Sequence, residues 1–357
     1  MSTDIAVVGA GLIGKEHIRR VTTSPTCKLV AIVDPAPAGA ELARQYGVPA
    51  FTDLDQLLAN VRPDGIVIAT PNRLHYEQGL RCVEADLPML LEKPVADNLT
   101  AAEALAARCH ERSATVLVGH HRTHSPVMRT TREVIDSGAL GQVVAVAATA
   151  FWYKPDDYFE GGPWRREIGG GPILINLIHE VHNLRIMCGG VAEVQAISSD
   201  RVRGFAVEDT AGVLMRFHRG AIATILMSDA AASGRSWEHT VHEDVNFATY
   251  PDEDCYHIVG TMGSLSVPTM RLQSFASAGQ RSWYTPMTQT RLERRHGDPL
   301  TAQMEHFGAL VRGEQESLCT IDDGVENVRV LDGVSRSALT GERVTFEPRS
   351  SLPADTE

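Results

Sequence analysis

Three glycines near the N-terminus have the spacing of a loop that holds phosphate groups. The segment GAGLIG, residues 9–14, follows an apolar run and opens a helical pattern. In such a G-x-G-x-x-G loop the first glycine permits a tight turn, the second lets a pyrophosphate approach the backbone, and the third lets the helix pack on the strand. The helix amides then hold the phosphate charge. The residues predicted to bind a dinucleotide here are Gly9, Gly11, Leu12, Ile13 and Gly14.

An acidic residue stands where the same motif needs one. Asp34 ends the second apolar run, 20 residues after Gly14. Its carboxylate can accept hydrogen bonds from the adenosine ribose hydroxyls but would repel a 2′-phosphate. The residues that follow, Pro35-Ala36-Pro37, include no arginine to accept that phosphate. NAD is therefore the predicted cofactor, in preference to NADP.

A lysine is placed where it can carry a proton. Lys93 follows the apolar run 89–91, at the predicted carboxyl end of a parallel strand, where open α/β sheets bind ligands. A free lysine, with a pKa near 10.4, is a poor base at pH 7, but desolvation and a nearby cation can lower the pKa to roughly 7–8. Pro94 restricts Lys93 to an extended backbone, and Glu92 can orient it.

A histidine follows a second glycine run. Gly169-Gly170-Gly171 precedes an apolar helical pattern that carries Asn176 and His179. His182 lies three residues further on, a spacing that can suit a metal ion on one helix face. The other histidine-rich stretch, residues 120–124, has no matching carboxylate pattern. We therefore predict no metal site.

The first 120 residues alternate short apolar runs with helical patterns. Strands are predicted at Ile5–Val8, Leu29–Val33, Gly65–Thr70, Met89–Leu91 and Thr115–Val118. Helices are predicted at Ile13–Thr22, Gly39–Tyr46, Leu54–Asn60, Leu74–Ala85 and Thr100–Arg112. This alternation is typical of a parallel sheet with right-handed crossovers and helices on both faces. It predicts an α/β Rossmann domain with a doubly wound parallel sheet.

The alternation of predicted strands and helices ends at about residue 123. Gln142–Tyr153 is a long β-forming run, and the runs 209–217 and 221–228 flank a short turn, as in a hairpin. Further strands are predicted at Cys255–Val259 and Leu265–Val267, and helices at Pro299–Arg312 and Asp322–Thr340. The second domain is predicted to be α+β with a large, mostly antiparallel open sheet. The domain boundaries are predicted as 1–122, 123–347 and a polar tail over 348–357.

Composition and charge predict which partners and which compartment the protein has. The chain has 357 residues, six cysteines without a C-x-x-C pair and a formal net charge of −12. It has no run of four or more Lys or Arg, so neither nucleic acid nor an anionic membrane is an expected partner. It also lacks 18 consecutive apolar residues and a basic leader region. The pattern predicts reduced thiols and a cytoplasmic protein.

Several segments together resemble the Gfo/Idh/MocA family of oxidoreductases, which includes glucose–fructose oxidoreductase and inositol dehydrogenases. They are GAGLIGKEH at 9–17, ATPNRLH at 69–75, EKP at 92–94, GHHR at 119–122 and the glycine run with His179. The resemblance covers roughly residues 4–346. It implies a dehydrogenase that moves hydride between a secondary alcohol of a sugar, polyol or cyclitol and nicotinamide C4. Lys93 matches the catalytic lysine of the family. A homodimer or homotetramer is expected by analogy.

The resemblance and the predicted strand ends together give a set of site residues. Lys93 and His179 are the predicted catalytic pair. Further cofactor contacts are predicted at Thr70, Pro71, Asn72, His75, Glu92 and Lys93. Substrate contacts are predicted at His121, Arg122, Tyr153, Trp164, Arg165, Asn176 and His179. In this set an aromatic face can stack on a sugar ring, and a guanidinium can bind carboxylate or hydroxyl groups.

The sequence departs from the family at one position. Members commonly carry Asp four residues before the histidine, where this chain has Ile175. Asn176, one residue later, can hydrogen-bond a substrate hydroxyl but cannot act as a base. Proton transfer would then fall on His179, supported by Lys93. Two alternatives stay open: a glycosidase that uses tightly held NAD, and a non-catalytic sugar-sensing regulator.

Overall fold

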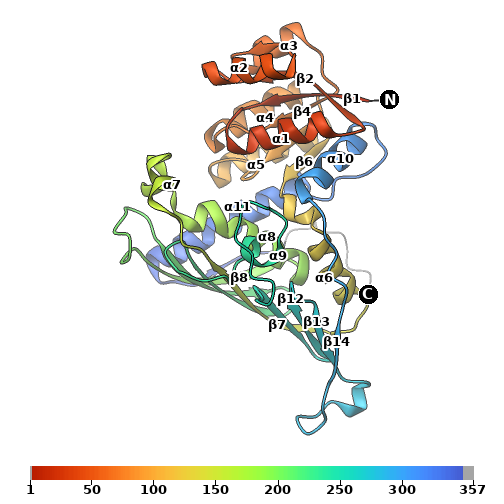
Figure 1. Cartoon of the computed structure of the whole chain (residues 1–357). Coiled ribbons are helices and arrows are strands. Elements are labelled where there is room, and N and C mark those ends of the chain that lie inside the picture. Colours follow the sequence, from red (N-terminus) through yellow and green to blue (C-terminus); the bar gives the residue numbers. More distant parts are fainter. Residues whose placement is uncertain (1, 349–357) are drawn as a thin grey trace. The chain divides into compact units, whose positions relative to one another are not determined.

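The computed structural model describes residues 2–348, which form two compact units (Figure 1). Unit 1 contains residues 2–124 together with Asp298–Arg329, and unit 2 contains Ser125–Gly297 together with residues 330–348. By its contacts, the segment 298–329 therefore packs with unit 1, although it lies far along the chain. The predicted domain boundary between residues 122 and 123 remains a prediction. From residue 349 onward, the predicted polar tail lies outside the described residues.

Unit 1 is built on a parallel sheet of six strands in the order β3-β2-β1-β4-β5-β6. The strands are β1 (Thr3–Val8), β2 (Cys27–Val33), β3 (Ala50–Phe51), β4 (Gly65–Ile68), β5 (Met89–Glu92) and β6 (Val116–Gly119). Every residue of β4, β5 and β6 is buried, as expected for strands covered on both faces. The predicted doubly wound α/β domain is confirmed. The two-residue strand β3 was not predicted, because it is too short to give a periodic pattern.

The helices of unit 1 cover both faces of this sheet. They are α1 (Leu12–Thr23), α2 (Pro37–Tyr46), α3 (Leu54–Asn60), α4 (His75–Glu84), α5 (Leu99–Arg112) and α10 (Pro299–Val311). Right-handed crossovers on the two sides of β1 place α1 and α2 on one face and α4 and α5 on the other. Helix α10 packs beside α1, and α4 packs beside α5. Asp53 and Asn98 cap α3 and α5 through their side-chain oxygens.

Unit 2 contains a sheet of nine strands in the order β14-β13-β12-β11-β7-β10-β9-β8-β15. The strands are β7 (Val143–Phe151), β8 (Val191–Ser199), β9 (Thr210–Phe217), β10 (Ile222–Ser228), β11 (Tyr256–Gly260), β12 (Gly263–Val267), β13 (Arg271–Ser274), β14 (Thr288–Arg291) and β15 (Val344–Thr345). All neighbours pair antiparallel except β7 and β10, which are parallel. The predicted α+β class and the hairpin of β9 and β10 are confirmed. Strands β8 and β13–β15 were not predicted.

One face of this sheet packs against helices. The helical segments of unit 2 are α6 (Pro126–Asp136), α7 (Asp156–Glu160), α8 (Ile178–Cys188), α9 (Trp237–Val241) and the C-terminal half of α11 (Ile321–Thr340). Val127 of α6, Val181 of α8 and Val334 of α11 share a core with inward side chains of the strands. Residues on β10 alternate between exposed and buried, as a strand with one covered face requires. Helix α6 was not predicted from sequence.

The remaining composition-based expectations concern thiols and membranes. All six cysteines are buried and none forms a disulfide. Burial raises the pKa of Cys82 to about 12, so this thiol stays protonated at neutral pH. None of the helices within residues 2–348 has the length and apolar character that crossing a bilayer would require.

Two strand glycines of unit 2 offer a matched test of this packing. A Cβ added to Gly260 would lie 2.1 Å from the Leu140 carbonyl oxygen, whereas one added to Gly212 would meet only Leu226 Cδ1, at 3.7 Å. Gly260→Ala should therefore lower the free energy of unfolding by about 1–3 kcal/mol. Gly212→Ala should be neutral or slightly stabilising. Urea denaturation of both variants checks this, and equal midpoints would show that the close approach at Gly260 is unimportant.

Candidate active site

The glycine loop lies at the carboxyl edge of the unit 1 sheet, between β1 and α1. Gly9 has a φ of +97°, and a Cβ there would lie 2.5 Å from the Ala69 carbonyl oxygen. A Cβ on Gly14 would lie 2.0 Å from the Gly9 carbonyl oxygen, whereas one on Gly11 would meet nothing within 4 Å. Two glycines are thus required by the turn itself, and the third keeps a space open beside the backbone. This geometry fits the pyrophosphate of a dinucleotide.

The Asp34 side chain, just after β2, forms a hydrogen bond with the backbone just after β1. Its Oδ2 accepts a hydrogen bond of 2.7 Å from the Ala10 amide, and its Oδ1 accepts one of 2.8 Å from the Ala36 amide. The absence of a Cβ on Gly39 makes room for the Asp34 side chain, since such an atom would lie 2.5 Å from Asp34 Cβ. The carboxylate is therefore fixed beside the glycine loop, at the position where the motif places its contact with ribose.

Lys93 directly follows β5, whose last residue is a buried and hydrogen-bonded carboxylate. The preceding residue, Glu92, accepts a hydrogen bond of 2.8 Å from Nε2 of His17, which lies on α1. Burial alone would raise the pKa of Glu92, but the hydrogen bond and charge of His17, with Lys93 and His121, hold the pKa of this carboxyl below its usual range. The Lys93 amide also donates to Glu92 Oε2, at 3.2 Å. Glu92 thus links the helix of the glycine loop to the backbone of Lys93.

His75 connects the loops that follow β4 and β5. Its Nε2 lies 2.8 Å from the Thr70 carbonyl oxygen and its Nδ1 lies 2.7 Å from the Pro94 carbonyl oxygen. Burial lowers the pKa of His75, although both carbonyl groups oppose this shift. Its side chain is fully buried, so we assign His75 to positioning the sheet edge. Thr70 Oγ1 donates to Gln78 Oε1 at 2.6 Å, and Pro71 and Asn72 form the start of the next short helix.

The last strand of unit 1 brings two more predicted residues to this edge. Strand β6 ends at Gly119, and a Cβ there would lie 2.8 Å from Glu92 Cα. His121 and Arg122 follow in a short 3-10 helix over His121–His124, where Arg122 is almost completely buried. His120 Nε2 accepts a hydrogen bond of 2.9 Å from Asn327 Nδ2 on α11. Their proposed contacts with substrate remain predictions.

The second glycine run belongs to unit 2 and makes room for a carboxylate. Gly171 has a φ of +78°, and a Cβ there would lie 2.6 Å from Glu208 Oε1. That oxygen accepts a hydrogen bond of 2.8 Å from the Ile173 amide. Burial raises the pKa of Glu208, although the hydrogen bond from Ile173 opposes this shift. Sequence analysis missed Glu208, because a carboxylate 35 residues from its partner amide leaves no local pattern.

The helix that carries His179 does not have α-helical spacing at its start. Residues Ile173–Leu177 form a π-helical turn, and regular α8 begins at Ile178. A π-helical turn contains more residues than an α-helical turn and is frequent at functional sites. Asn176 lies in this wider turn and His179 lies in α8, and each residue of the wider turn advances by a smaller angle than in an α-helix. Asn176 lies further round the helix from His179 than α-helical spacing would place it.

Asn176 contacts a lysine that sequence analysis did not select. Lys154 Nζ donates a hydrogen bond of 2.6 Å to Asn176 Oδ1 and lies 3.7 Å from Asp229 Oδ2. Burial lowers the pKa of Lys154 to about 8. Asp229 also accepts a hydrogen bond of 2.8 Å from Arg203 Nε. The only sequence signal for this cluster was polar residues directly after two predicted strands.

The aromatic and cationic residues predicted to contact substrate lie around α7 and the following 3-10 helix. Tyr153 and Trp164 are exposed. The Arg165 guanidinium lies 3.9 Å from the centre of the Tyr158 ring and 5.6 Å from that of Trp164, and it donates to the Tyr158 carbonyl oxygen. The stacking geometry holds Arg165 in place. The sugar-binding roles of Tyr153, Trp164 and Arg165 remain predictions.

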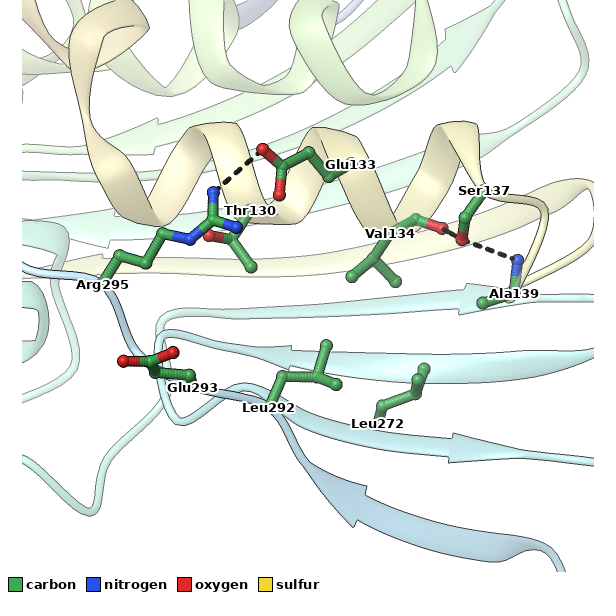
Figure 2. Close-up of a pocket in the computed structure, with 9 residues that line it drawn as sticks. All are labelled: Thr130, Glu133, Val134, Ser137, Ala139, Leu272, Leu292, Glu293 and Arg295. Carbon is green, nitrogen blue, oxygen red and sulfur yellow. Dashed lines mark hydrogen bonds and ion pairs between the residues drawn. The ribbon is translucent and has the colours of Figure 1, made fainter.

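A separate pocket of about 360 Å³ lies in unit 2 between α6 and the strand segments near Leu272 and Leu292. Figure 2 shows the Arg295 side chain reaching Glu133 across this pocket, with an N–O distance of 2.9 Å. The lining includes none of the residues predicted to bind cofactor or substrate, so we place the active site elsewhere. Among residues 2–348, no group of three or more His, Cys, Asp or Glu side chains has the arrangement of a metal site.

The fold and the glycine loop define a class of protein, one with a dinucleotide-binding Rossmann domain. Comparison with known families agrees. Residues 3–120 match the family described as "Oxidoreductase family, NAD-binding Rossmann fold", and residues 132–346 match its C-terminal alpha/beta domain. The chain therefore belongs to the Gfo/Idh/MocA oxidoreductase family, and its cofactor is NAD.

Individual relatives are distant but similar over their full length. Inositol 2-dehydrogenase of Rhizobium meliloti is 25% identical over 354 residues, which cover 97% of this chain and 100% of the relative. The scyllo-inositol 2-dehydrogenase (NAD+) of Bacillus subtilis is 24% identical, with 96% of each chain covered. An oxidoreductase from Agrobacterium radiobacter, solved with NAD+, L-tartaric acid and magnesium, shares the fold with a TM-score of 0.80 at 20% identity, covering 97% and 98% of the two chains. These likenesses support a general sugar or polyol oxidoreductase.

The glycine loop generates a prediction that separates folding from cofactor binding. Gly14→Ala should lower the free energy of unfolding by about 1–3 kcal/mol, because the new Cβ overlaps the Gly9 carbonyl group. Gly11→Ala should keep the wild-type melting temperature, since Gly11 has a φ of −69° and open space beside it. It should weaken NAD binding by about tenfold or more, because the Cβ takes the space of the pyrophosphate. Thermal melts and calorimetric titration with NAD measure both effects. Unchanged NAD affinity in Gly11→Ala would contradict this placement of the cofactor.

The His17–Glu92 pair predicts a pH-dependent stability. Because the folded-state pKa of Glu92 is depressed, its charge stabilises the fold above the unfolded pKa and this contribution is lost as the pH falls through the folded-state pKa. Glu92→Gln should lose about 1–3 kcal/mol of unfolding free energy at pH 7, and a smaller amount at an acidic pH below the ordinary pKa of a glutamate. Glu84→Gln is the control, since Glu84 pairs with Arg108 at the surface and should change little. A deficit of equal size at both pH values would show that the charge of Glu92 is not involved.

Proposed function

We propose that this chain is an NAD-dependent dehydrogenase that oxidises a secondary alcohol of a sugar, polyol or cyclitol, or reduces the matching ketone. One observation carries the proposal: the buried His17–Glu92 hydrogen bond holds the backbone of Lys93 to the helix of the glycine loop. The backbone of Lys93 and the glycine loop therefore belong to one rigid edge of unit 1. The names of the two inositol dehydrogenases point to the same class of substrate.

The reaction separates a hydride from a proton. Bound NAD supplies the hydride acceptor, C4 of its nicotinamide ring. The C–H bond of the substrate carbinol carbon breaks with its electron pair, the O–H bond loses a proton, and a ketone remains. The sequence-based expectation gave this proton to His179 with Lys93 in support. We assign the proton instead to the Lys93 amine, because the contacts of Glu92 and Pro94 hold the Lys93 backbone at the edge that carries the glycine loop, and His179 takes the supporting role. In the reverse direction, Lys93 returns the proton to the ketone oxygen.

The protein residues around Lys93 serve to position it. Glu92 is anionic and buried, and its contact with His17 leaves it little freedom to move. His75 fixes the carbonyl group of Pro94 on the other side of Lys93. The main chain of the lysine is thus held before and after the residue. Such positioning is what proton transfer requires, because misplacement by about 1 Å can cost roughly 100-fold in rate.

Removal of the Lys93 amine tests the mechanism. Lys93→Ala should lower kcat by about 10²–10⁴-fold, because the group that takes the hydroxyl proton is lost. NAD affinity should stay within about twofold of wild type, since the glycine loop and Asp34 are unchanged. Lys28→Ala, which alters an exposed lysine on β2 of the same unit, is the matched control. Turnover is followed by reduced-nicotinamide absorbance with a panel of sugars and cyclitols. Wild-type turnover in Lys93→Ala would refute the assigned mechanism.

A further inference from the structure

The carboxyl ends of β7 and β10 present charged residues that have no part in the proposed proton transfer. These two strands are parallel neighbours, with Phe151 opposite Ser228 at their ends. Lys154 and Asp229 therefore leave the sheet at the same edge. Ligand sites form preferentially at the carboxyl ends of parallel strands, because loops from neighbouring strands meet there. This edge of unit 2 is a candidate binding site.

Lys154 is held at the centre of this edge. Its side chain is only 12% exposed, and its Nζ donates to Asn176 Oδ1 at 2.6 Å. The same nitrogen lies 3.7 Å from Asp229 Oδ2 and 5.0 Å from the centre of the Tyr158 ring. Its contacts thus come from three separate segments of unit 2. A lysine with so little exposure is rare unless it has a structural partner or a ligand.

Asp229 forms a shorter ion pair with Arg203 than with Lys154. The Arg203 guanidinium donates to Asp229 Oδ1 at 2.8 Å, and the exposed fractions of these side chains are 7% and 4%. Arg203 also donates to the carbonyl oxygens of Lys154, at 2.8 Å, and of Asp229. Arg203 therefore neutralises the buried carboxylate and ties the two strand ends together. The Lys154 ammonium is left at the longer distance from that carboxylate.

The charges that face Lys154 come from every segment packed around it. They are the carboxylates of Asp229 and Glu238 and the guanidiniums of Arg165 and Arg203. Glu238, on α9, accepts a hydrogen bond of 2.9 Å from Trp152 Nε1. Further carboxylates lie beside these groups: Asp156 is 3.9 Å from Arg203, and Asp209 raises the pKa of Asp229. Burial lowers the pKa of Lys154 to about 8, with Asp229 and Glu238 opposing the shift, which leaves it mostly protonated at pH 7.

The contact with Lys154 also fixes the polarity of Asn176. An ammonium group can only donate hydrogen bonds, so the amide oxygen must face it and Nδ2 lies on the opposite side of the amide. Asn176 therefore presents N–H donors away from Lys154. At this place in the helix the chain offers donors and one positive charge, where Asp would offer acceptors and a negative charge.

We propose that Lys154 and Asn176 form a carboxylate-binding subsite, so that the substrate of this chain is a polyhydroxy acid such as an aldonate or uronate. This inference rests on the proposed dehydrogenase function and names its substrate class. A carboxylate presents two acceptor oxygens, so it can accept from both the Lys154 ammonium group and the Asn176 Nδ2 group. It also brings a negative charge, which attracts the Lys154 ammonium group. His179 follows Asn176 by three residues, at the start of α8.

The test compares sugars that differ only in the carboxylate. D-gluconate and D-glucuronate are paired with D-glucitol and D-glucose, and each is measured by calorimetric titration and by reduced-nicotinamide absorbance with NAD. The wild-type protein should bind and oxidise the acids at least about tenfold better than their neutral partners at pH 7. Lys154→Gln should lower affinity for the acids by about ten- to one-hundred-fold and leave the neutral compounds unchanged. Equal affinity for acids and neutral partners in the wild-type protein would overturn the subsite.

Matched variants separate a specific contact from a general charge effect. Arg201→Gln removes a positive charge from unit 2 at a side chain that is 93% exposed, and it should leave acid binding unchanged. Lys154→Arg keeps the charge and should retain acid binding above pH 9, whereas wild-type affinity should fall as the pH rises above about 8. A wild-type pH profile that matches Lys154→Arg would overturn the role of the Lys154 ammonium.

The binding and turnover measurements distinguish the two proposals. Acid binding that depends on Lys154, without turnover of any compound, supports the subsite and contradicts the dehydrogenase function. Turnover that depends on Lys93, with acids bound no better than their neutral partners and no loss of acid affinity in Lys154→Gln, supports the dehydrogenase function and overturns the subsite.

Discussion

The buried hydrogen bond between His17 and Glu92 is the constraint on which the catalytic edge of unit 1 depends. Nearly dry surroundings make an isolated carboxylate unfavourable, so Glu92 stays anionic only because His17 and neighbouring cations face it. His17 lies on α1, whose start forms the glycine loop, and Glu92 is bonded to Lys93. A single contact between distant parts of the chain therefore sets the position of the proposed base relative to the cofactor cradle.

Unit 2 also contains buried carboxylates, and different residues stabilise them. There Arg203 neutralises the buried Asp229 and bridges the ends of two parallel strands, while Glu208 accepts from the first amide of the π-helical turn. Both carboxylates are satisfied within the unit. Lys154 and Asn176 are then held in defined positions by their mutual hydrogen bond, and the Lys154 ammonium lies 3.7 Å from Asp229 Oδ2. This arrangement leaves donor groups for a ligand, which is the basis of the proposed carboxylate subsite.

The sequence predicted features that depend on local pattern. The alternation of apolar runs and helices gave the parallel sheet, and glycine spacing gave the loop at 9–14 with Asp34 beyond it. Pairings between distant residues were not predictable, because neither His17–Glu92 nor Lys154–Asn176 leaves a periodic signal. The π-helical turn at Ile173–Leu177 was missed for a further reason. Four of its five residues, ILINL, are apolar and all are compatible with an α-helix, so the local pattern does not distinguish the wider turn. Short edge strands such as β3 and β15 have too few residues to show alternation.

The central claim is that this chain moves a hydride from a substrate carbon to NAD. The most direct measurement supplies polyols, cyclitols and sugar acids deuterated at carbon, and examines the reduced nicotinamide by mass spectrometry. The account predicts a mass increase of one deuterium in the reduced cofactor for at least one compound, with the matching ketone as the other product. A chain that binds NAD but transfers no deuterium from any of these compounds would contradict it.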